Sequence, residues 1–199
     1  MSVRIIILAA ILFVTGCASN PMVIAPDQKL QEPLVDESQV VFMRSSFVGS
    51  AISASLYEVT DGDIKFIGVI ANGVKLSYKT TPGKHVFMVV SEAADFMEAD
   101  LTPGKNYFGI ATPRMGAWVA RFSLWPIKSS PEADFRLNTP EFRKWVDNTQ
   151  LVENTDKSLA WYEKNKKSIK SKYEKYWPAW ENKSAEDVLK RTLSPEDGV

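Results

Sequence analysis

The stretch Asn72-Gly73-Val74-Lys75-Leu76-Ser77-Tyr78-Lys79 carries the clearest fold signal in the chain. Apolar Val74, Leu76 and Tyr78 alternate with polar residues, which is the period of a strand that buries one face. Asn-Gly before such a run is typical of a tight hairpin turn, because both central positions of that turn require a positive φ. The stretch therefore predicts a hairpin turn followed by a half-buried strand.

Runs of the same kind fill the chain from residue 39 to 127 and are separated by turn residues, among them Asp61-Gly62. Short strands at a spacing of about 8–12 residues are typical of all-β sandwiches and barrels. We therefore predict a mainly β fold at 39–127, an antiparallel β-sandwich of about eight short strands. The runs expected as strands are 40–43, 51–59, 64–70, 74–78, 85–90, 96–101, 106–111 and 117–125.

The tetrapeptide Thr-Pro-Gly-Lys occurs twice, at 81–84 and 102–105. Proline fixes φ at the first central position of a type II turn, and glycine supplies the positive φ that the second position needs. Two copies favour a pair of equivalent sheet corners over a solenoid, which requires more repeats.

Five stretches within about 39–125 form a recognisable set: Val40-Val41-Phe42-Met43-Arg44-Ser45-Ser46-Phe47-Val48-Gly49-Ser50, Ile67-Gly68, Asn72-Gly73, Pro82-Gly83-Lys84-His85 and Leu101-Thr102-Pro103-Gly104-Lys105-Asn106-Tyr107. With them this region resembles the DUF2846 family of bacterial proteins, which are often lipid-anchored. Family members usually have a proline where this chain has Ser45, and the segment 60–65 is longer than usual here. The resemblance implies a small β-sandwich without an established activity.

Residues 1–16 have the parts of an export signal peptide: a basic start, an apolar run and small residues before a cleavage site. The apolar run is too short to span a membrane, which takes about 20 residues. Val14-Thr15-Gly16-Cys17 resembles the lipobox of bacterial lipoproteins, which implies cleavage between Gly16 and Cys17 and acylation of Cys17, palmitate included. An ordinary secretory signal with an unrelated cysteine is the alternative.

The lipobox resemblance implies three acyl chains on Cys17, the only cysteine, and several chains make attachment durable where one is marginal. Ala18-Ser19 lack the aspartate that retains such proteins in the inner membrane, so the family rule favours the periplasmic face of the outer membrane. No thiol remains for disulfides or cysteine metal sites. Residues 17–38 are expected to form a lipidated tether, although Met22-Val23-Ile24 could pack locally.

The composition changes after residue 127, and we expect a helical C-terminal extension at 128–199. Thr139-Pro140-Glu141 is typical of a helix start, and Ser184 is expected to begin a last helix that includes Leu193. Between them we expect a long helix from about Thr155 to Trp177, stopped or kinked by Pro178. Its apolar residues fall on one stripe: Leu159, Tyr162, Ile169, Tyr173 and Tyr176.

No local pattern identifies a catalytic residue, a metal site or a cofactor, and we predict none. His85, the lone histidine, has no neighbouring partner, and the nucleophile-elbow, phosphate-loop and dinucleotide glycine patterns do not occur. Glu98 and Asp100 share a strand face near Asp95 and could hold calcium, but such acids more often form a solvated face. Basic and acidic residues number 24 each, a balance that gives no support to nucleic-acid binding.

Two places are candidates for interaction. Arg44 and Phe47 flank a Ser-rich loop, and loops on rigid scaffolds often carry binding, although Phe47 could instead cover the sheet edge. In the expected long helix, seven lysines between 156 and 175 accompany Trp161, Tyr173 and Trp177. This aromatic stripe could pack on the sandwich, bind a partner or lie on an anionic membrane.

These features predict a non-catalytic, membrane-anchored periplasmic lipoprotein that acts as an interaction or envelope-structural module, with the membrane and an envelope protein as partners. The alternative is a hydrolase or small-ligand-binding lipoprotein whose site is assembled from residues distant in sequence. A deep polar pocket that joins His85 to acids and a serine would favour the alternative.

Overall fold

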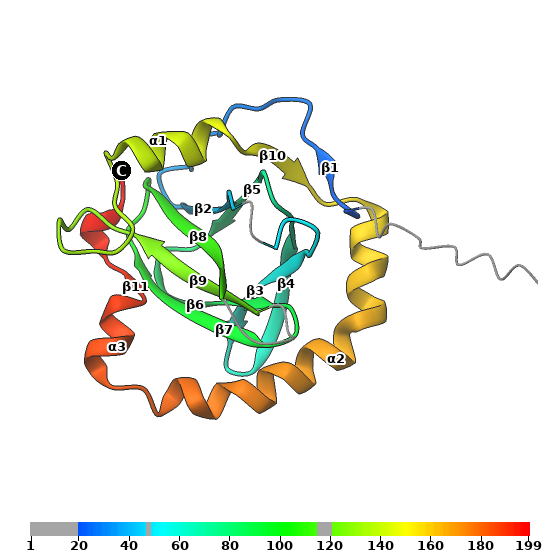
Figure 1. The fold of residues 1–199 in the computed structure, drawn as a ribbon. Coiled ribbons are helices and arrows are strands. Elements are labelled where there is room, and N and C mark those ends of the chain that lie inside the picture. The colour runs from blue at the N-terminus through cyan, green and yellow to red at the C-terminus, as the bar shows by residue number, and fades with distance from the viewer. Residues whose placement is uncertain (1–19, 47–48, 115–120) are drawn as a thin grey trace, which may run out of the picture.

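The computed structural model describes residues 20–46, 49–114 and 121–199, which form two β-sheets packed face to face (Figure 1). One sheet has six strands in the order β1-β10-β5-β2-β8-β9, and the other has five in the order β11-β7-β6-β3-β4. The predicted mainly β, sandwich-like fold is confirmed. The strands are β1 (Val23–Ile24), β2 (Ser38–Arg44), β3 (Ala54–Thr60), β4 (Asp63–Ile70), β5 (Val74–Thr80), β6 (Gly83–Val90), β7 (Ala94–Leu101), β8 (Asn106–Arg114), β9 (Arg121–Ile127), β10 (Gln150–Glu153) and β11 (Thr192–Leu193).

Most strand pairs are antiparallel, as predicted, but both sheets are mixed. The central strands β2 and β8 run parallel. β10 and β11 also pair in parallel, with β5 and β7 respectively. Eight strands, β2 to β9, come from the region predicted to form the sandwich. The other three have two to four residues each, which is too short for an alternating pattern to reveal.

The facing sides of the two sheets enclose the main hydrophobic core. Phe42 of β2 and Phe87 of β6 meet edge to face across it, with ring centroids 5.1 Å apart, and Met97 and Leu124 are fully buried beside them. Burial of a side chain of this size contributes about 1.5–3 kcal/mol. The packed core therefore holds the edges and loops of the sandwich in fixed positions, where functional side chains can lie.

The two turns that contain Asp-Gly and Asn-Gly behave differently. Asp61 and Gly62 both have a positive φ, 48° and 82°, and close a tight hairpin between β3 and β4. The hairpin predicted at Asn72-Gly73 is wrong, because β4 and β5 belong to different sheets. Of these two residues only Gly73 has a positive φ, 76°. An Asn-Gly pair can make a sharp turn both in a hairpin and in a link between two sheets. Here it makes the link, and β5 pairs in antiparallel fashion with β2.

Both Thr-Pro-Gly-Lys copies lie at corners between the sheets, as predicted. The first links β5 of the six-stranded sheet to β6 of the five-stranded sheet, and the second links β7 back to β8. Gly83 and Gly104 have φ values of 114° and 72°, in the region that residues with a side chain rarely adopt.

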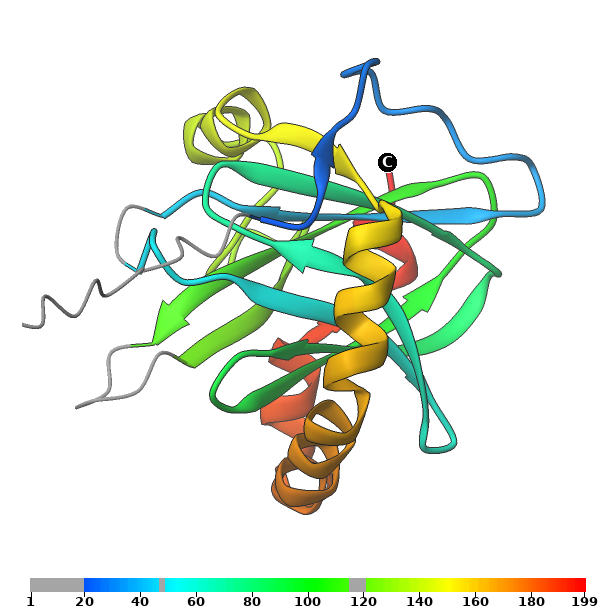
Figure 2. The same cartoon turned by 90° about the vertical axis from the view of Figure 1, so that its right-hand side faces the viewer.

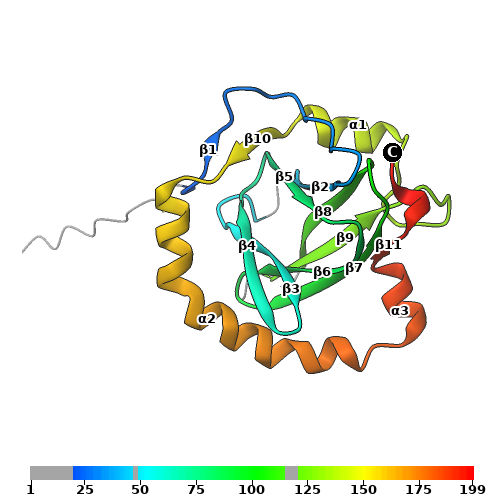
Figure 3. The same cartoon turned by 180° about the vertical axis from the view of Figure 1, so that it is seen from behind.

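Residues 128–199 run around the sandwich as a belt (Figures 1 and 3). The belt contains α1 (Pro140–Asp147), α2 (Asp156–Glu181), α3 (Ala185–Lys190), the strands β10 and β11, and a short 3-10 helix (Pro195–Asp197). Its two ends are joined, since the backbone N–H and the hydroxyl of Ser129 donate to Asp197 Oδ1 at 2.7 and 3.0 Å. The final residue, Val199, exchanges two backbone hydrogen bonds with Asn106. The belt therefore closes on the sandwich and on itself.

The helix starts follow the sequence closely. Thr139, Thr155 and Ser184 each accept a hydrogen bond from the backbone of the first turn that follows, which is the geometry of an N-terminal cap.

Three expectations for the helices are wrong. Of the two effects predicted for Pro178, a stop or a kink, the stop is wrong: α2 continues to Glu181, and Trp177 and Trp180 on either side of the proline both pack on Phe96. Leu159 is half exposed and lies off the buried stripe, where Ser158 takes its place. Leu193 belongs to β11, because α3 ends at Lys190.

Candidate functional site

Glu58 is the centre of a polar cluster at the corner where β5 passes into β6. Tyr78 donates its hydroxyl to Glu58 Oε2 at 2.5 Å, and His85 Nδ1 contacts Oε1 at 2.5 Å. The Thr80 hydroxyl donates to Oε1 at 3.3 Å. Tyr78 comes from the six-stranded sheet, whereas Glu58 and His85 come from the five-stranded sheet. The cluster therefore ties the two sheets together at this end of the sandwich.

The hydrogen bonds of this cluster favour the charged form of His85. Both ring nitrogens face acceptors, the Glu58 carboxylate and the carbonyl oxygen of Thr81 at 2.8 Å, and only the protonated ring has a donor for each of them. Burial lowers the pKa of His85, but the bonds to Glu58 and Thr81 and the charges of Glu58 and Asp100 outweigh it and raise the pKa above its ordinary value.

Glu58 is shifted in the complementary direction. Burial raises its pKa, but the hydrogen bonds from His85 and Tyr78 and the charges of His85 and Lys65 outweigh burial, so the pKa of Glu58 lies below its ordinary value. Burial and the bond to Glu58 raise the pKa of Tyr78. These shifts all favour a charged imidazole, a carboxylate and a neutral phenol. With its nitrogens already donating, His85 offers no lone pair to a substrate proton.

Two surface grooves meet at Lys84 and His85. One, of about 690 Å³, runs over β7 to α3, with Glu98 and Asp100 on one side and apolar Leu189 on the other. The second, of about 600 Å³, is lined by Glu58, Lys65 and Lys79, besides the residues that the two grooves share. Both volumes lie in the range of small-molecule sites, about 300–1,000 Å³. The described residues lining these grooves join His85 to acids, as the alternative function requires, but include no serine.

Arg44, predicted as a recognition residue, is fully buried. Its guanidinium donates to the carbonyl oxygens of Ile52 at 2.5 Å and Gly49 at 2.6 Å, and it lies 4.2 Å from the centre of the Phe122 ring. Burial lowers the pKa of Arg44 to about 10. The side chain holds the 49–52 loop from inside and presents no charge to a partner. Phe47, the other candidate at this loop, lies outside the described residues.

The aromatic stripe of α2 packs on the five-stranded sheet, one of the three alternatives for it. Tyr162 stacks on Phe66 of β4, with ring centroids 4.9 Å apart and planes 2° from parallel. The predicted interaction residues lie on the same inner side: Trp161 contacts Phe66, and both Tyr173 and Trp177 contact Phe96 of β7. Their rings are half buried against the sandwich, so they leave little aromatic surface for a separate partner.

The acids of β7 do not gather into a cation site. Glu98 and Asp100 line the larger groove, whereas Asp95 forms an ion pair with the buried Arg191 of the belt and accepts from the backbone of Leu124. In the ranges that the structure describes, no group of three or more His, Cys, Asp or Glu residues is placed to hold a metal ion.

The chain joins the sandwich directly after the predicted anchor. Gly16 and Cys17 lie outside the described residues, but Met22 is buried in the main core, where its sulfur accepts from the backbone N–H of Val69 at 3.4 Å. β1 then pairs with β10. This part of the predicted tether is packed on the domain, which was the alternative stated for Met22-Val23-Ile24. Of the helices that the structure describes, none combines the length and apolar character that crossing a bilayer requires.

Sequence reasoning missed the two polar groups that the structure makes central. Glu58 is 27 residues from His85, and Asp95 is 96 residues from Arg191, so no local spacing connects the partners. A weak signal exists for Glu58, because a carboxylate between Tyr57 and Val59 interrupts an otherwise apolar run. An alternating strand places Glu58 on the same face as Leu56, where it requires polar neighbours.

Comparison of the sequence with models of protein families gives no match. Comparison with curated proteins gives no match either.

Proposed function

We propose that the protein is a lipid-anchored envelope protein whose folded domain serves as a non-catalytic interaction or structural module. The anchor would be Cys17, and its position would be the periplasmic face of the outer membrane. The N-terminal sequence motivates the anchor, and the packing of the residues that follow supports a role for the domain at the membrane surface.

The entry of the chain into the fold at Met22 is the observation that carries this proposal. A fully extended chain covers about 3.5 Å per residue, so the five residues from Cys17 to Met22 reach at most about 17 Å. Met22 is held in the core and β1 is paired with β10. Acyl chains on Cys17 would therefore keep the sandwich close to the bilayer, because no long flexible linker separates the two. The resulting high local concentration strengthens weak contacts with membrane partners.

The polar cluster around Glu58 supports the non-catalytic part. Its carboxylate oxygens and ring nitrogens are occupied by partners within the chain, and they connect strands of both sheets. Such saturation suits a group that fixes the packing of a scaffold.

The test of the anchor is Cys17→Ser in cells that make the full-length protein. We expect the variant to lose palmitate labelling and to leave the membrane fraction, whereas Ser19→Ala as the matched control keeps both. Density separation of the two membranes then checks the outer-membrane position. Labelling that persists in Cys17→Ser would refute the proposal.

A second candidate function, binding of a small molecule, is favoured by the groove of about 690 Å³ beside His85. Its wall includes Val86, Val188 and Leu189, and Lys84 supplies a positive charge, which suits a ligand with an apolar body and an anionic group. The fluorescent probe anilinonaphthalene sulfonate has this chemistry. If the groove binds it, Leu189→Glu should abolish the fluorescence gain, because a carboxylate replaces apolar surface and repels the sulfonate, and Leu34→Glu, at an exposed residue elsewhere, should not.

A further inference from the structure

We propose that one particular face of the domain rests on the lipid surface, an inference that depends on the anchoring proposed above. We call it the anchor face. It comprises β1 and residues 156–167 of α2, and its exposed residues include the apolar Val23, Ile24 and Leu159, four lysines, and the acids Asp156 and Glu163. The lysines are Lys157, Lys164, Lys166 and Lys167.

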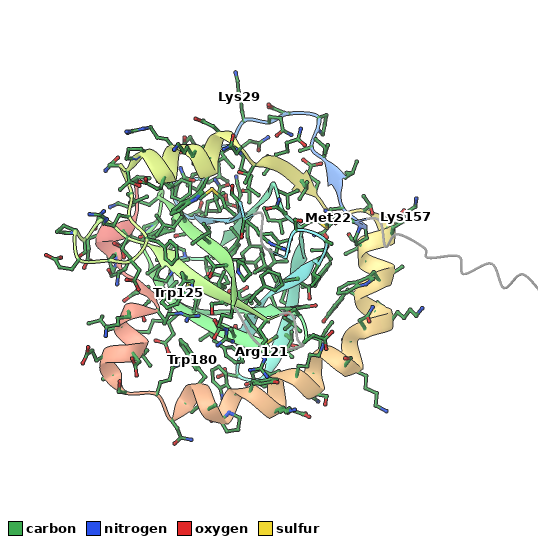
Figure 4. All side chains as sticks on the ribbon, in the orientation of Figure 1. Met22, Lys29, Arg121, Trp125, Lys157 and Trp180 are labelled. Carbon is green, nitrogen blue, oxygen red and sulfur yellow. The ribbon has the colours of Figure 1, made fainter. Side chains whose placement is uncertain are left out.

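The start of α2 is fastened to the residues that follow the anchor. The hydroxyl of Thr155, which caps α2, donates to the carbonyl oxygen of Pro21 at 2.8 Å. Pro21 is four residues after Cys17, a distance that an extended chain covers with at most about 14 Å. Figure 4 shows Met22 and Lys157 at the same corner of the molecule, and in Figure 2 β1 and α2 lie across the side that faces the viewer. An anchor at Cys17 therefore brings this side to the bilayer.

The exposed groups of the anchor face suit a headgroup layer. Val23, Ile24 and Leu159 are 48, 54 and 50% exposed, and they are three of the few large apolar residues that the described chain leaves in solvent. Between residues 156 and 167 there are four lysines against two acids, so this part of α2 carries a net positive charge. Lysine side chains close to a bilayer are attracted to anionic headgroups, and isolated apolar residues enter the interface.

The packing of α2 decides how it meets the membrane. The aromatic side of the helix is turned inward onto Phe66 and Phe96, so α2 does not embed an apolar stripe in the bilayer. Its lysine side is left outward. Contact with the membrane is therefore made by lysines and a few apolar side chains at the level of the headgroups, while the sandwich stays in the aqueous layer.

The absence of any other cysteine makes the test direct. Acylation consumes the thiol of Cys17, the only cysteine, so Leu159→Cys introduces a single thiol for an environment-sensitive fluorophore. Leu189→Cys is the matched control, because Leu189 is also an exposed leucine of a belt helix, 63% exposed, but lies on α3. The acylated proteins are placed in vesicles of phosphatidylethanolamine and phosphatidylglycerol that contain a headgroup quencher.

We expect quenching of most of the emission at position 159 and little at 189. Equal quenching at both positions, or quenching at 189 alone, would overturn the inference while leaving the anchor intact. Protein that is not acylated and does not remain with the vesicles would instead overturn the proposed function. Lys157→Glu, Lys164→Glu and Lys167→Glu together should reduce quenching at 159 several-fold, and full quenching in that triple variant would overturn the role of the lysines.

Discussion

The belt is fastened to the sandwich by two different kinds of contact along its length. α2 is held by five aromatic rings, including Tyr162 and Trp177, whose centroids lie within 6.2 Å of the ring centroid of Phe66 or Phe96 in the five-stranded sheet. The segment 191–199 inserts Leu193 into the main core and adds a set of specific polar contacts. Arg191 pairs with Asp95, Asp197 accepts from Ser129, and Val199 pairs with Asn106.

The two kinds of contact have different roles: apolar contacts supply most of the stability, and polar contacts specify the position of the chain. Apolar contacts scale with the area that they bury and tolerate small shifts. Buried hydrogen bonds and ion pairs are geometrically exacting, and loss of one partner leaves the other unpaired at a cost of about 1–3 kcal/mol, or more for a charge. We therefore interpret α2 as the main source of the belt's stability and the segment 191–199 as the part that sets where the belt ends.

The largest effect is expected from Phe96→Ala. Phe96 is 2% exposed and contacts the rings of Tyr173, Trp177 and Trp180, so its loss empties the centre of the aromatic contact. We expect the free energy of unfolding to fall by about 4 kcal/mol, as measured by urea denaturation. Leu159→Ala, at a half-exposed residue of the same helix, is the control and should cost little. A cost below about 1 kcal/mol for Phe96→Ala would contradict the strength assigned to α2.

The second effect is on the ion pair at the other end of the belt. Arg191→Met leaves the Asp95 carboxylate with the backbone N–H of Leu124 and, at 3.8 Å, the exposed Arg114, and we expect a loss of about 3 kcal/mol. Because replacement of both charges removes the unpaired group, Asp95→Leu combined with Arg191→Met should recover much of that loss. If the double variant is as unstable as the single one, this pair contributes through packing rather than charge. The contrast between the apolar contacts of α2 and the polar contacts of 191–199 would then not hold for Arg191.

The third effect concerns the closure of the belt. Asp197→Ala removes the acceptor of Ser129 and of Ser194, and we expect a loss of about 1–2 kcal/mol. Hydrogen exchange should become faster in 191–199 and remain unchanged in α2. Glu196→Ala, at the exposed neighbour, is the control. Faster exchange throughout α2 would show that the aromatic contacts of α2 depend on the contacts of the segment 191–199.

The sequence predicted what local patterns encode. Alternation located strands β2 to β9, and Thr139, Thr155 and Ser184 marked the helix starts, because both signals are complete within a few residues. It did not predict which strands pair. Gly73 needs a positive φ in a hairpin and in a link between sheets alike, so the turn at Asn72-Gly73 gave no information about the partner of β5.

The polar sites were hidden for the same reason. Arg44 beside a Ser-rich loop has the same sequence whether its side chain points to solvent or into the core, and only the carbonyl oxygens of Gly49 and Ile52 decide it. The partners Glu58 and His85 meet only because β3 and β6 are neighbours. Leu193 fits the helical pattern of the preceding residues, but in the fold it belongs to β11, which pairs with β7. Long-range strand pairing thus determined the Glu58–His85 contact and the position of Leu193.

The smallest effect is a pH dependence that should be independent of the belt. The pKa of His85 is raised above its ordinary value of 6.5, so its contribution to stability is complete below that pH and is lost as pH rises through the folded-state pKa. The pKa of Glu58 is lowered from 4.5, so its contribution is present above that pH and is lost as pH falls through its folded-state pKa. The cluster therefore stabilises the fold most between these two pH values.

We expect the free energy of unfolding of the unmodified protein to decline from pH 6 to pH 9, as followed by urea denaturation at each pH. His85→Gln should lack this decline, because glutamine has no proton to lose over that range. Asp197→Ala should retain the full decline, since His85 bonds to β3 and to Thr81 and not to the belt. A decline that disappears in Asp197→Ala would mean that the cluster and the belt form one cooperative unit, and the distinction between sandwich and belt would then have to be abandoned.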